Sequence, residues 1–278
     1  MSSKILDAIF WVKFASQIEG QEFLSGGGTG FVIFVEGKGY FVTARHVVKD
    51  YDINDIYISS PNYEDTANIP FNQMIHSIDT TINEPNDVCL FAIDTQKLET
   101  AFIREHPVQE FTDIVVNSKR FKNICSLACS SHRKFKKIIK TKAYLRSNQK
   151  VARDIEESKM FLMHIKDLPY DPNPVFQDGE QLRVLGYPHA EQSIDYEQNH
   201  IKETLVLLVG EYSKISKLPN PEYHTFRYKI NDKNHDLNGF SGAPVLNTQK
   251  KVVGMMTNGG NGFAYFIDMN FILKHLEQ

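Results

Sequence analysis

The apolar residues of this chain are grouped into short runs that are separated by turn-forming residues. Between 31 and 93 the apolar runs alternate with polar clusters at 59–62 and 83–86. A second series of apolar runs lies at 182–187, 203–209, 225–230, 244–246, 251–257 and 262–267. Short runs rich in β-branched and aromatic residues, bounded by Gly, Pro, Asn and Ser, are typical of β-strands. The pattern therefore predicts an all-β fold of antiparallel strands in two series.

Helical spacing is restricted to the two ends of the chain. Within residues 1–20, Ile5, Ile9 and Val12 are spaced as on one face of a helix, which predicts a short amphipathic segment. Such a segment can pack on the β-structure or dock a partner, and we favour packing. At the other end, Asn270 is placed to cap a short closing helix.

The middle of the chain, 98–180, has a different composition. Between Lys119 and Arg153 there are twelve Lys or Arg residues and no Asp or Glu. A basic block of this kind can contact nucleic acid, an acidic protein or a phospholipid surface. We favour a solvated face balanced by nearby acids, because basic and aromatic residues do not alternate here as in nucleic-acid-binding segments. A regulatory partner at this block is the second interpretation.

Composition limits the class of protein. The net charge of −3 argues neither for nor against a polyanionic partner. No apolar run approaches the roughly 20 residues of a membrane span, and the apolar stretch 8–12 is bracketed by Asp7 and Lys13 without an export-type cleavage site. We expect a soluble cytoplasmic protein without a membrane partner.

The cysteines support a reducing compartment. There are three, Cys89, Cys125 and Cys129, which is an odd and sparse set for a disulfide framework. Cys125 and Cys129 have the spacing C-x3-C, but no second cysteine pair accompanies them. We therefore predict no metal site and no cofactor.

Three motifs carry the candidate chemistry. Ser241 lies in G-F-S-G-A-P, His46 follows an apolar run in T-A-R-H-V, and Asp87 opens an apolar run in N-D-V-C-L. The order His, Asp, Ser distinguishes between known templates for a nucleophilic serine. An α/β-hydrolase has the serine first and a G-x-S-x-G elbow, whereas position 243 here is Ala. A subtilisin has Asp before His, and only Asp7 precedes His46.

These motifs resemble those of the chymotrypsin-like (trypsin-like) serine peptidases, in a disulfide-poor intracellular form. Three further stretches agree with the family: G-T-G-F-V-I at 28–33, L-G-Y-P at 185–188 and V-V-G-M-M-T-N-G at 252–259. The resemblance implies two antiparallel six-stranded barrels that share a cleft. It divides the chain into an N-terminal segment (1–20), a first barrel (21–97), a basic inter-barrel insertion (98–180) and a second barrel with the C-terminal helix (181–278).

The resemblance also implies a function. It identifies a catalytic triad of His46, Asp87 and Ser241, with an oxyanion hole formed by the backbone N–H groups of Gly239 and Ser241. The chain would then be a serine endopeptidase that cleaves protein or peptide substrates through an acyl-enzyme. Phe240 replaces the aspartate that pairs with a new N-terminus in the digestive enzymes. We therefore expect regulation by a partner, by the insertion or by cleft opening, without zymogen cleavage.

Substrate-binding residues follow from the same resemblance. Thr257, Asn258 and Gly259 would form one wall of the specificity pocket and pair with the substrate backbone, with Ala264 and Tyr265 on the far side. The pocket floor would be formed at His235, which would favour an acidic or polar substrate side chain, and Asp236, which would favour a basic one.

An inactive fold is the competing hypothesis. Phe240, together with Ala243 in place of a second glycine, is compatible with a catalytically inactive trypsin-like module that binds protein or nucleic acid.

Overall fold

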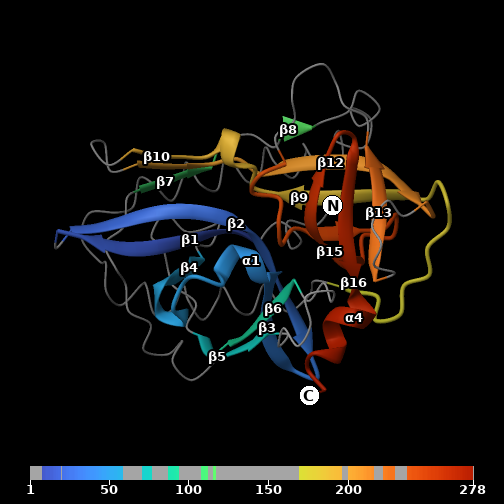
Figure 1. The fold of residues 1–278 in the computed structure, drawn as a ribbon, viewed down its shortest axis with the longest axis horizontal. Helices are drawn as coiled ribbons and strands as arrows, with labels where there is room; N and C mark the ends of the chain where they lie inside the picture. The colour runs from blue at the N-terminus through green and yellow to red at the C-terminus, as the bar shows by residue number, and fades with distance from the viewer. Residues whose placement is uncertain are drawn as a thin grey trace, which may run out of the picture.

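The computed structural model describes residues 8–19, 21–58, 71–76, 87–93, 108–111, 115–116, 169–195, 200–215, 222–228 and 237–277. Within these ranges the chain is mainly β-structure, arranged as two large sheets with a small third sheet beside them (Figure 1).

The first sheet has six antiparallel strands in the order β4-β1-β2-β3-β6-β5. Their bounds are β1 Ile9–Ile18, β2 Gln21–Val35, β3 Lys38–Ala44, β4 Ile56–Ile58, β5 Phe71–His76 and β6 Val88–Ile93. Glu36 and Gly37 join β2 to β3 with φ values of 50° and 80°, and two positive φ values suit the twist of a tight hairpin. Phe41, Phe71 and Phe91 pack together inside this sheet.

The helical spacing predicted near the N-terminus is wrong from residue 9 onward. Residues Ile9–Ile18 form β1, which pairs with β2 on one side and with β4 on the other. Ile9 and Val12 are both fully buried. Residues on opposite faces of the strand can both be buried here because β1 is covered on both faces: Phe10 and Trp11, which lie between Ile9 and Val12, are buried as well.

The second sheet closes into a barrel. Its order is β13-β16-β15-β14-β9-β12-β8, and an additional pairing of β13 with β12 closes the six strands from β13 to β12 into a ring, with β8 outside it. The bounds are β8 Val115–Val116, β9 Gln181–Gly186, β12 Val206–Ser213, β13 Tyr223–Tyr228, β14 Pro244–Leu246, β15 Val252–Gly260 and β16 Phe263–Asp268. Asn261 and Gly262, with φ of 53° and 83°, form the tight turn between β15 and β16.

The predicted all-β architecture is confirmed, and the prediction of two six-stranded barrels is shown in part. The second sheet contains a closed six-stranded barrel. In the first sheet, the described residues show no pairing between the terminal strands β4 and β5, so that sheet is a half-barrel there.

A third sheet lies along the β1–β2 hairpin (Figure 1). It has the order β10-β11-β7, with β7 at Val108–Phe111, β10 at Ser193–Asp195 and β11 at His200–Glu203. The run predicted at 203–209 is therefore divided between β11 and β12. At the break, Gln192 donates to Thr204 O and accepts from Thr204 N, at 2.8 Å each. The basic block between Lys119 and Arg153 lies outside the described residues.

A buried ion pair joins the first sheet to the third. Lys13 of β1 donates a hydrogen bond to Glu203 of β11, and the two side chains are 0% and 1% exposed. Burial lowers the pKa of the Lys13 ammonium, while the charge and the hydrogen bond of Glu203 oppose this effect. Lys13, which follows the apolar stretch 8–12 in the sequence, is thus itself part of the core.

The predicted closing helix is present as α4, Met269–Lys274. Its N-cap is Asp268 and not the predicted Asn270: the Asp268 carboxylate accepts from Phe271 N at 2.8 Å. A carboxylate is also favourable at the positive end of a helix. No helix in the described ranges is long and apolar enough to span a membrane.

Candidate active site

His46 and Asp87 are held together at one end of the first sheet. His46 lies on the single turn α1 (Arg45–Val48), directly after β3, and Asp87 directly precedes β6. Asp87 Oδ2 is 2.7 Å from His46 Nδ1, and Oδ1 accepts from His46 N at 2.9 Å. The Asp87 carbonyl also accepts from Arg45 N at 3.1 Å.

The tautomer of His46 follows from these contacts. An ionised carboxylate can only accept, so Nδ1 carries a hydrogen and the lone pair of a neutral ring is on Nε2. The His46 side chain is 46% exposed, whereas that of Asp87 is 19% exposed. The pair is thus fixed on the protein side and open to a substrate on the other.

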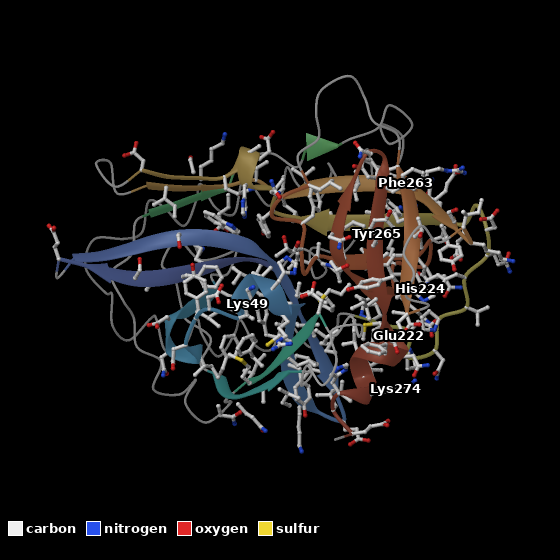
Figure 2. All side chains as sticks on the ribbon, in the orientation of Figure 1. Lys49, Glu222, His224, Phe263, Tyr265 and Lys274 are labelled. Atoms are coloured by element: carbon white, nitrogen blue, oxygen red, sulfur yellow. The ribbon has the colours of Figure 1, made fainter. Side chains whose placement is uncertain are left out.

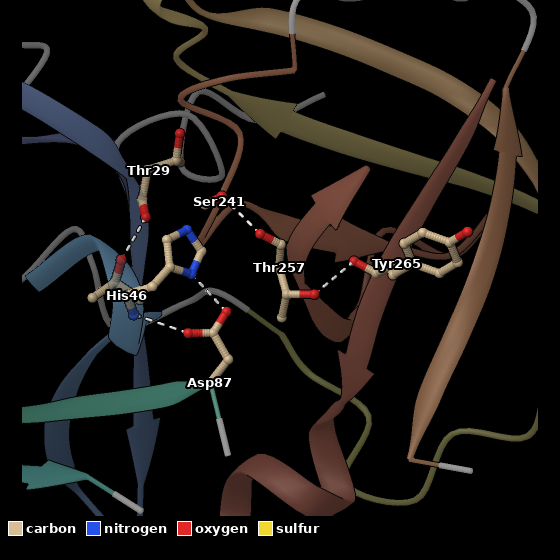
Figure 3. A network of polar contacts seen from close by, with 7 residues as sticks. Thr29, His46, Asp87, Ser241, Thr257 and Tyr265 are labelled. Atoms are coloured by element: carbon tan, nitrogen blue, oxygen red, sulfur yellow. Dashed lines mark hydrogen bonds and ion pairs between the residues drawn. The ribbon is translucent and has the colours of Figure 1, made fainter. Parts of the chain in front are cut away.

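Ser241 lies beside this pair although it comes from the second half of the chain. A Cβ added at Gly28 would lie 2.9 Å from Ser241 O and 2.8 Å from Val47 Cγ2, which places Ser241 next to α1. Figure 3 shows the His46 ring between Asp87 and Ser241. The Ser241 hydroxyl donates to Thr257 O at 2.7 Å, so its hydrogen is not directed at His46.

Two backbone N–H groups next to the serine are available to a ligand. Asn238 O accepts from His189 N at 2.8 Å, and Phe240 O accepts from Ala243 N at 2.9 Å. All described peptide bonds are trans, so the N–H groups of Gly239 and Ser241 point away from these partners. Neither N–H has an acceptor within the described part of the chain.

Two glycines are required by the shape of this loop. Gly239 has φ of +95°, and a Cβ there would lie 2.4 Å from Tyr187 O. Gly242 has φ of +87°, and its Cβ would lie 1.9 Å from Thr29 O. Side chains at either position would meet backbone that cannot move aside.

Phe240 is part of the apolar core of the second barrel. Its side chain is 2% exposed and packs so closely on Gly186 that a Cβ there would be 2.6 Å from the ring. The loop is therefore anchored at this position by apolar packing.

The predicted wall residues are the end of β15. Thr257 is fully buried and donates to Tyr265 O at 3.2 Å, whereas Asn258 and Gly259 are exposed. Gly259 pairs with Ala264, which is buried, and a Cβ at Gly259 would lie 2.7 Å from Leu237 Cδ1.

The structure thus places Leu237 next to the predicted wall, which the sequence did not indicate. The two predicted floor residues, His235 and Asp236, lie outside the described residues.

A second His–Asp pair lies on the second barrel, between β13 and the end of β16. His224 Nε2 is 3.2 Å from Asp268 Oδ2, and His224 Nδ1 is 3.3 Å from Tyr212 Oη. The ring stacks on Phe266 and contacts Phe176. Figure 2 shows His224 on the barrel, above Lys274 of α4.

No metal site is formed by the residues that the structure describes: no three His, Cys, Asp or Glu side chains come together there as a metal ion would require.

Sequence reasoning missed Thr29 as a residue that contacts this loop. It lies within the G-T-G-F-V-I stretch, but nothing in that stretch indicates that its hydroxyl contacts Gly239 O at 2.6 Å across the sheet boundary. His189, whose amide holds Asn238 O, was missed for the same reason.

Comparison with known proteins supports the fold. No protein-family model matches the sequence, and no curated protein matches it. Among solved structures, an HtrA-type protease, AlgW with a decapeptide, matches with a TM-score of 0.53 and 12% identity. The match covers 99% of this chain and 65% of that chain, so the present chain spans about two thirds of its length. The chain therefore has the fold of the trypsin-like serine proteases of the HtrA type.

Proposed function

We propose that the chain is a serine endopeptidase whose catalytic residues are His46, Asp87 and Ser241. The observation that carries the proposal is the 2.7 Å contact of Asp87 with His46 Nδ1, in a site where Ser241 lies beside the ring. A buried or half-buried carboxylate that orients a histidine next to a serine is the arrangement needed for acyl transfer.

The proposed reaction begins when Ser241 Oγ attacks the carbonyl carbon of the substrate peptide bond. His46 Nε2 takes the hydroxyl proton and then passes it to the nitrogen of the leaving amine, while Asp87 stabilises the imidazolium. The negative oxygen of the tetrahedral intermediate accepts from the N–H groups of Gly239 and Ser241. A water molecule, activated by His46 in the same way, then hydrolyses the acyl-enzyme.

One rotation is needed before this reaction. The Ser241 hydroxyl must turn from Thr257 O toward His46 Nε2, which a change of χ1 between staggered rotamers achieves. Thr257 O can then accept from a substrate N–H, and the exposed edge at Asn258 and Gly259 can pair with the substrate backbone. The matched AlgW structure contains a decapeptide, which supports a peptide as the class of ligand.

The loop architecture supports control without zymogen cleavage. Phe240 is buried in apolar surroundings and cannot pair with a new N-terminal amine. Any control would then act through a partner or through the access of substrate. An activation step that requires trimming of the N-terminus would contradict this part of the proposal.

Labelling with a fluorophosphonate probe tests the function. We expect wild-type protein to be labelled covalently, Ser241→Ala to be unlabelled, and His46→Ala to lose labelling by several orders of magnitude. Ser213→Ala, a buried serine of β12, is the matched control and should label like the wild type.

The alternative is an inactive fold that binds peptides in the same place. The turned Ser241 hydroxyl is the observation that favours it. Peptide binding by a wild-type protein that is never labelled would establish this alternative and exclude the peptidase.

A further inference from the structure

Thr29 belongs to the first sheet but contacts the backbone around the nucleophile. It lies on β2 and is fully buried. Its amide donates to Ser241 O at 2.9 Å, and its hydroxyl donates to Gly239 O at 2.6 Å. A single residue thus holds carbonyls on both sides of Phe240.

The hydroxyl of Thr29 is itself held in place. It accepts from Tyr187 N at 2.9 Å, so its own hydrogen is left for Gly239 O. The Thr29 carbonyl accepts from Thr43 Oγ1 at 2.8 Å, which fixes the residue on the side of β3. Because every one of these groups is buried, none can exchange its partner for water without exposing the site.

These contacts restrain the backbone that links the two amides proposed for the oxyanion hole. Gly239 has no side chain, so its peptide planes can rotate unless hydrogen bonds hold them. Asn238 O is held by His189 N, and Gly239 O is held by the Thr29 hydroxyl, so the planes on both sides of Gly239 are fixed. The contact of Thr29 N with Ser241 O fixes the plane that follows the nucleophile.

We propose that Thr29 is a positioning residue, whose hydroxyl holds the Gly239–Ser241 backbone so that the N–H groups of Gly239 and Ser241 point at a developing oxyanion. This inference rests on the proposed function. The inference goes beyond the proposed function because it assigns the alignment of a loop in the second half of the chain to a side chain in the first half. The peptide plane between Gly239 and Phe240 carries a second hydrogen bond, from Phe240 N to Leu237 O at 3.0 Å, and the Thr29 hydroxyl is the contact that holds its carbonyl end.

The test compares Thr29→Val with Thr29→Ser. Valine has nearly the shape of threonine and keeps the backbone amide, but it lacks the hydroxyl. We expect kcat on a peptide substrate, and the rate of fluorophosphonate labelling, to fall about tenfold to a hundredfold with little change in KM. Thr29→Ser, which retains the hydroxyl, should restore kcat to within about threefold of the wild type.

Thr225→Val is the matched control. Thr225 is also a buried threonine on a strand, but its hydroxyl has no hydrogen-bond partner within the described part of the chain. We expect unchanged kcat in this variant. An unchanged kcat in Thr29→Val as well, or a loss that Thr29→Ser does not restore, would overturn the inference. If Thr29→Val does not fold, Thr29→Cys, with a weaker donor, should have a kcat clearly below that of Thr29→Ser, and equal values in the two variants would overturn the inference.

A readout independent of activity separates the inference from the proposed function. In protein labelled with ¹⁵N-glycine, the amide resonance of Gly239 should shift and broaden in Thr29→Val and return in Thr29→Ser. A wild-type protein that neither reacts with the fluorophosphonate probe nor cleaves peptides would refute the proposed peptidase function. The Gly239 amide resonance would still decide the role of Thr29. An unperturbed Gly239 resonance in Thr29→Val would refute that role.

Discussion

The chain contains two His–Asp pairs, and they differ in what surrounds them. His46 and Asp87 are 2.7 Å apart, with the histidine 46% exposed. His224 and Asp268 are 3.2 Å apart, with the histidine 20% exposed. The first ring has one nitrogen bound to the carboxylate and the other directed at solvent and Ser241, whereas both nitrogens of the second ring contact protein side chains.

The comparison shows that a His–Asp contact does not by itself define a catalytic site. Asp268 caps helix α4 while it contacts His224, so its two oxygens are engaged in holding structure. The His224 ring packs against both Phe176 and Phe266. A catalytic histidine needs one nitrogen available for proton transfer, and His46 has it because α1 presents the ring at the edge of the first sheet.

Replacing the carboxylate in each pair gives the largest expected difference in kcat between the two pairs. Asp87→Asn should lower kcat by about 10⁴-fold, because an amide cannot hold the same His46 tautomer. The hydrogen bond from Arg45 N to the Asp87 carbonyl does not involve the side chain, so the fold should persist. Asp268→Asn should leave kcat within about twofold. Comparable losses in both variants, measured by peptide hydrolysis, would remove the distinction between the pairs.

Replacing the histidine should lower the free energy of unfolding more in the His224–Asp268 pair than in the His46–Asp87 pair, the reverse of the order expected for kcat. His224→Gln removes a ring packed among aromatic side chains and should lower the free energy of unfolding by about 1–3 kcal/mol. His46→Gln removes a half-exposed ring and should change it by about 0.5 kcal/mol while abolishing labelling. Urea denaturation of both variants measures the difference. A larger destabilisation in His46→Gln would show that the first pair is primarily structural.

The smallest expected effect is a pH dependence of stability at Asp268. Burial alone would raise the pKa of its carboxyl, but hydrogen bonds from His224 and Phe271 N and the nearby charges outweigh it, so the pKa lies below 3.8. A depressed pKa stabilises the fold when the group is ionised, above the unfolded-state pKa of about 3.9. That stabilisation is lost as the pH falls through the folded-state pKa.

The free energy of unfolding of wild type and Asp268→Asn, measured from pH 6 to pH 2, tests this sign. The difference should be constant above about pH 5 and shrink below about pH 4. Because the side chain is 23% exposed, we expect a modest difference. A difference that grows toward low pH would contradict the contribution of the ionised carboxylate.

Much of the fold was visible in the sequence because strands and tight turns are local. The apolar runs from 182 onward correspond to β9, β12, β13, β14, β15 and β16 with small shifts at their ends. The N-terminal strand was misread because apolar residues at helical spacing are also compatible with a strand that is buried on both faces, as Ile9 to Val12 are. The helix cap was displaced by two residues, since Asp268 and Asn270 are both suitable caps and the end of β16 decides between them.

The residues of the candidate site also separate into those that the sequence predicted and those that it did not. His46, Asp87, Gly239 and Ser241 were predicted because their motifs resemble those of a known family, and the contact between His46 and Asp87 is present. Thr29 and the buried Lys13 were not predicted as contact residues. Their partners, Gly239 and Glu203, are 210 and 190 residues away in the chain.

The sequence by itself determined where strands can form, which residues can turn and which side chains can carry acyl-transfer chemistry. These properties depend on residue type and on neighbours a few positions away. Only the tertiary structure decided which histidine lies beside a serine, that a lysine can be buried against a glutamate, and that Thr29 contacts the backbone at Gly239 and Ser241. Such contacts depend on how two sheets pack, and packing brings together residues whose spacing in the chain carries no signal of their proximity.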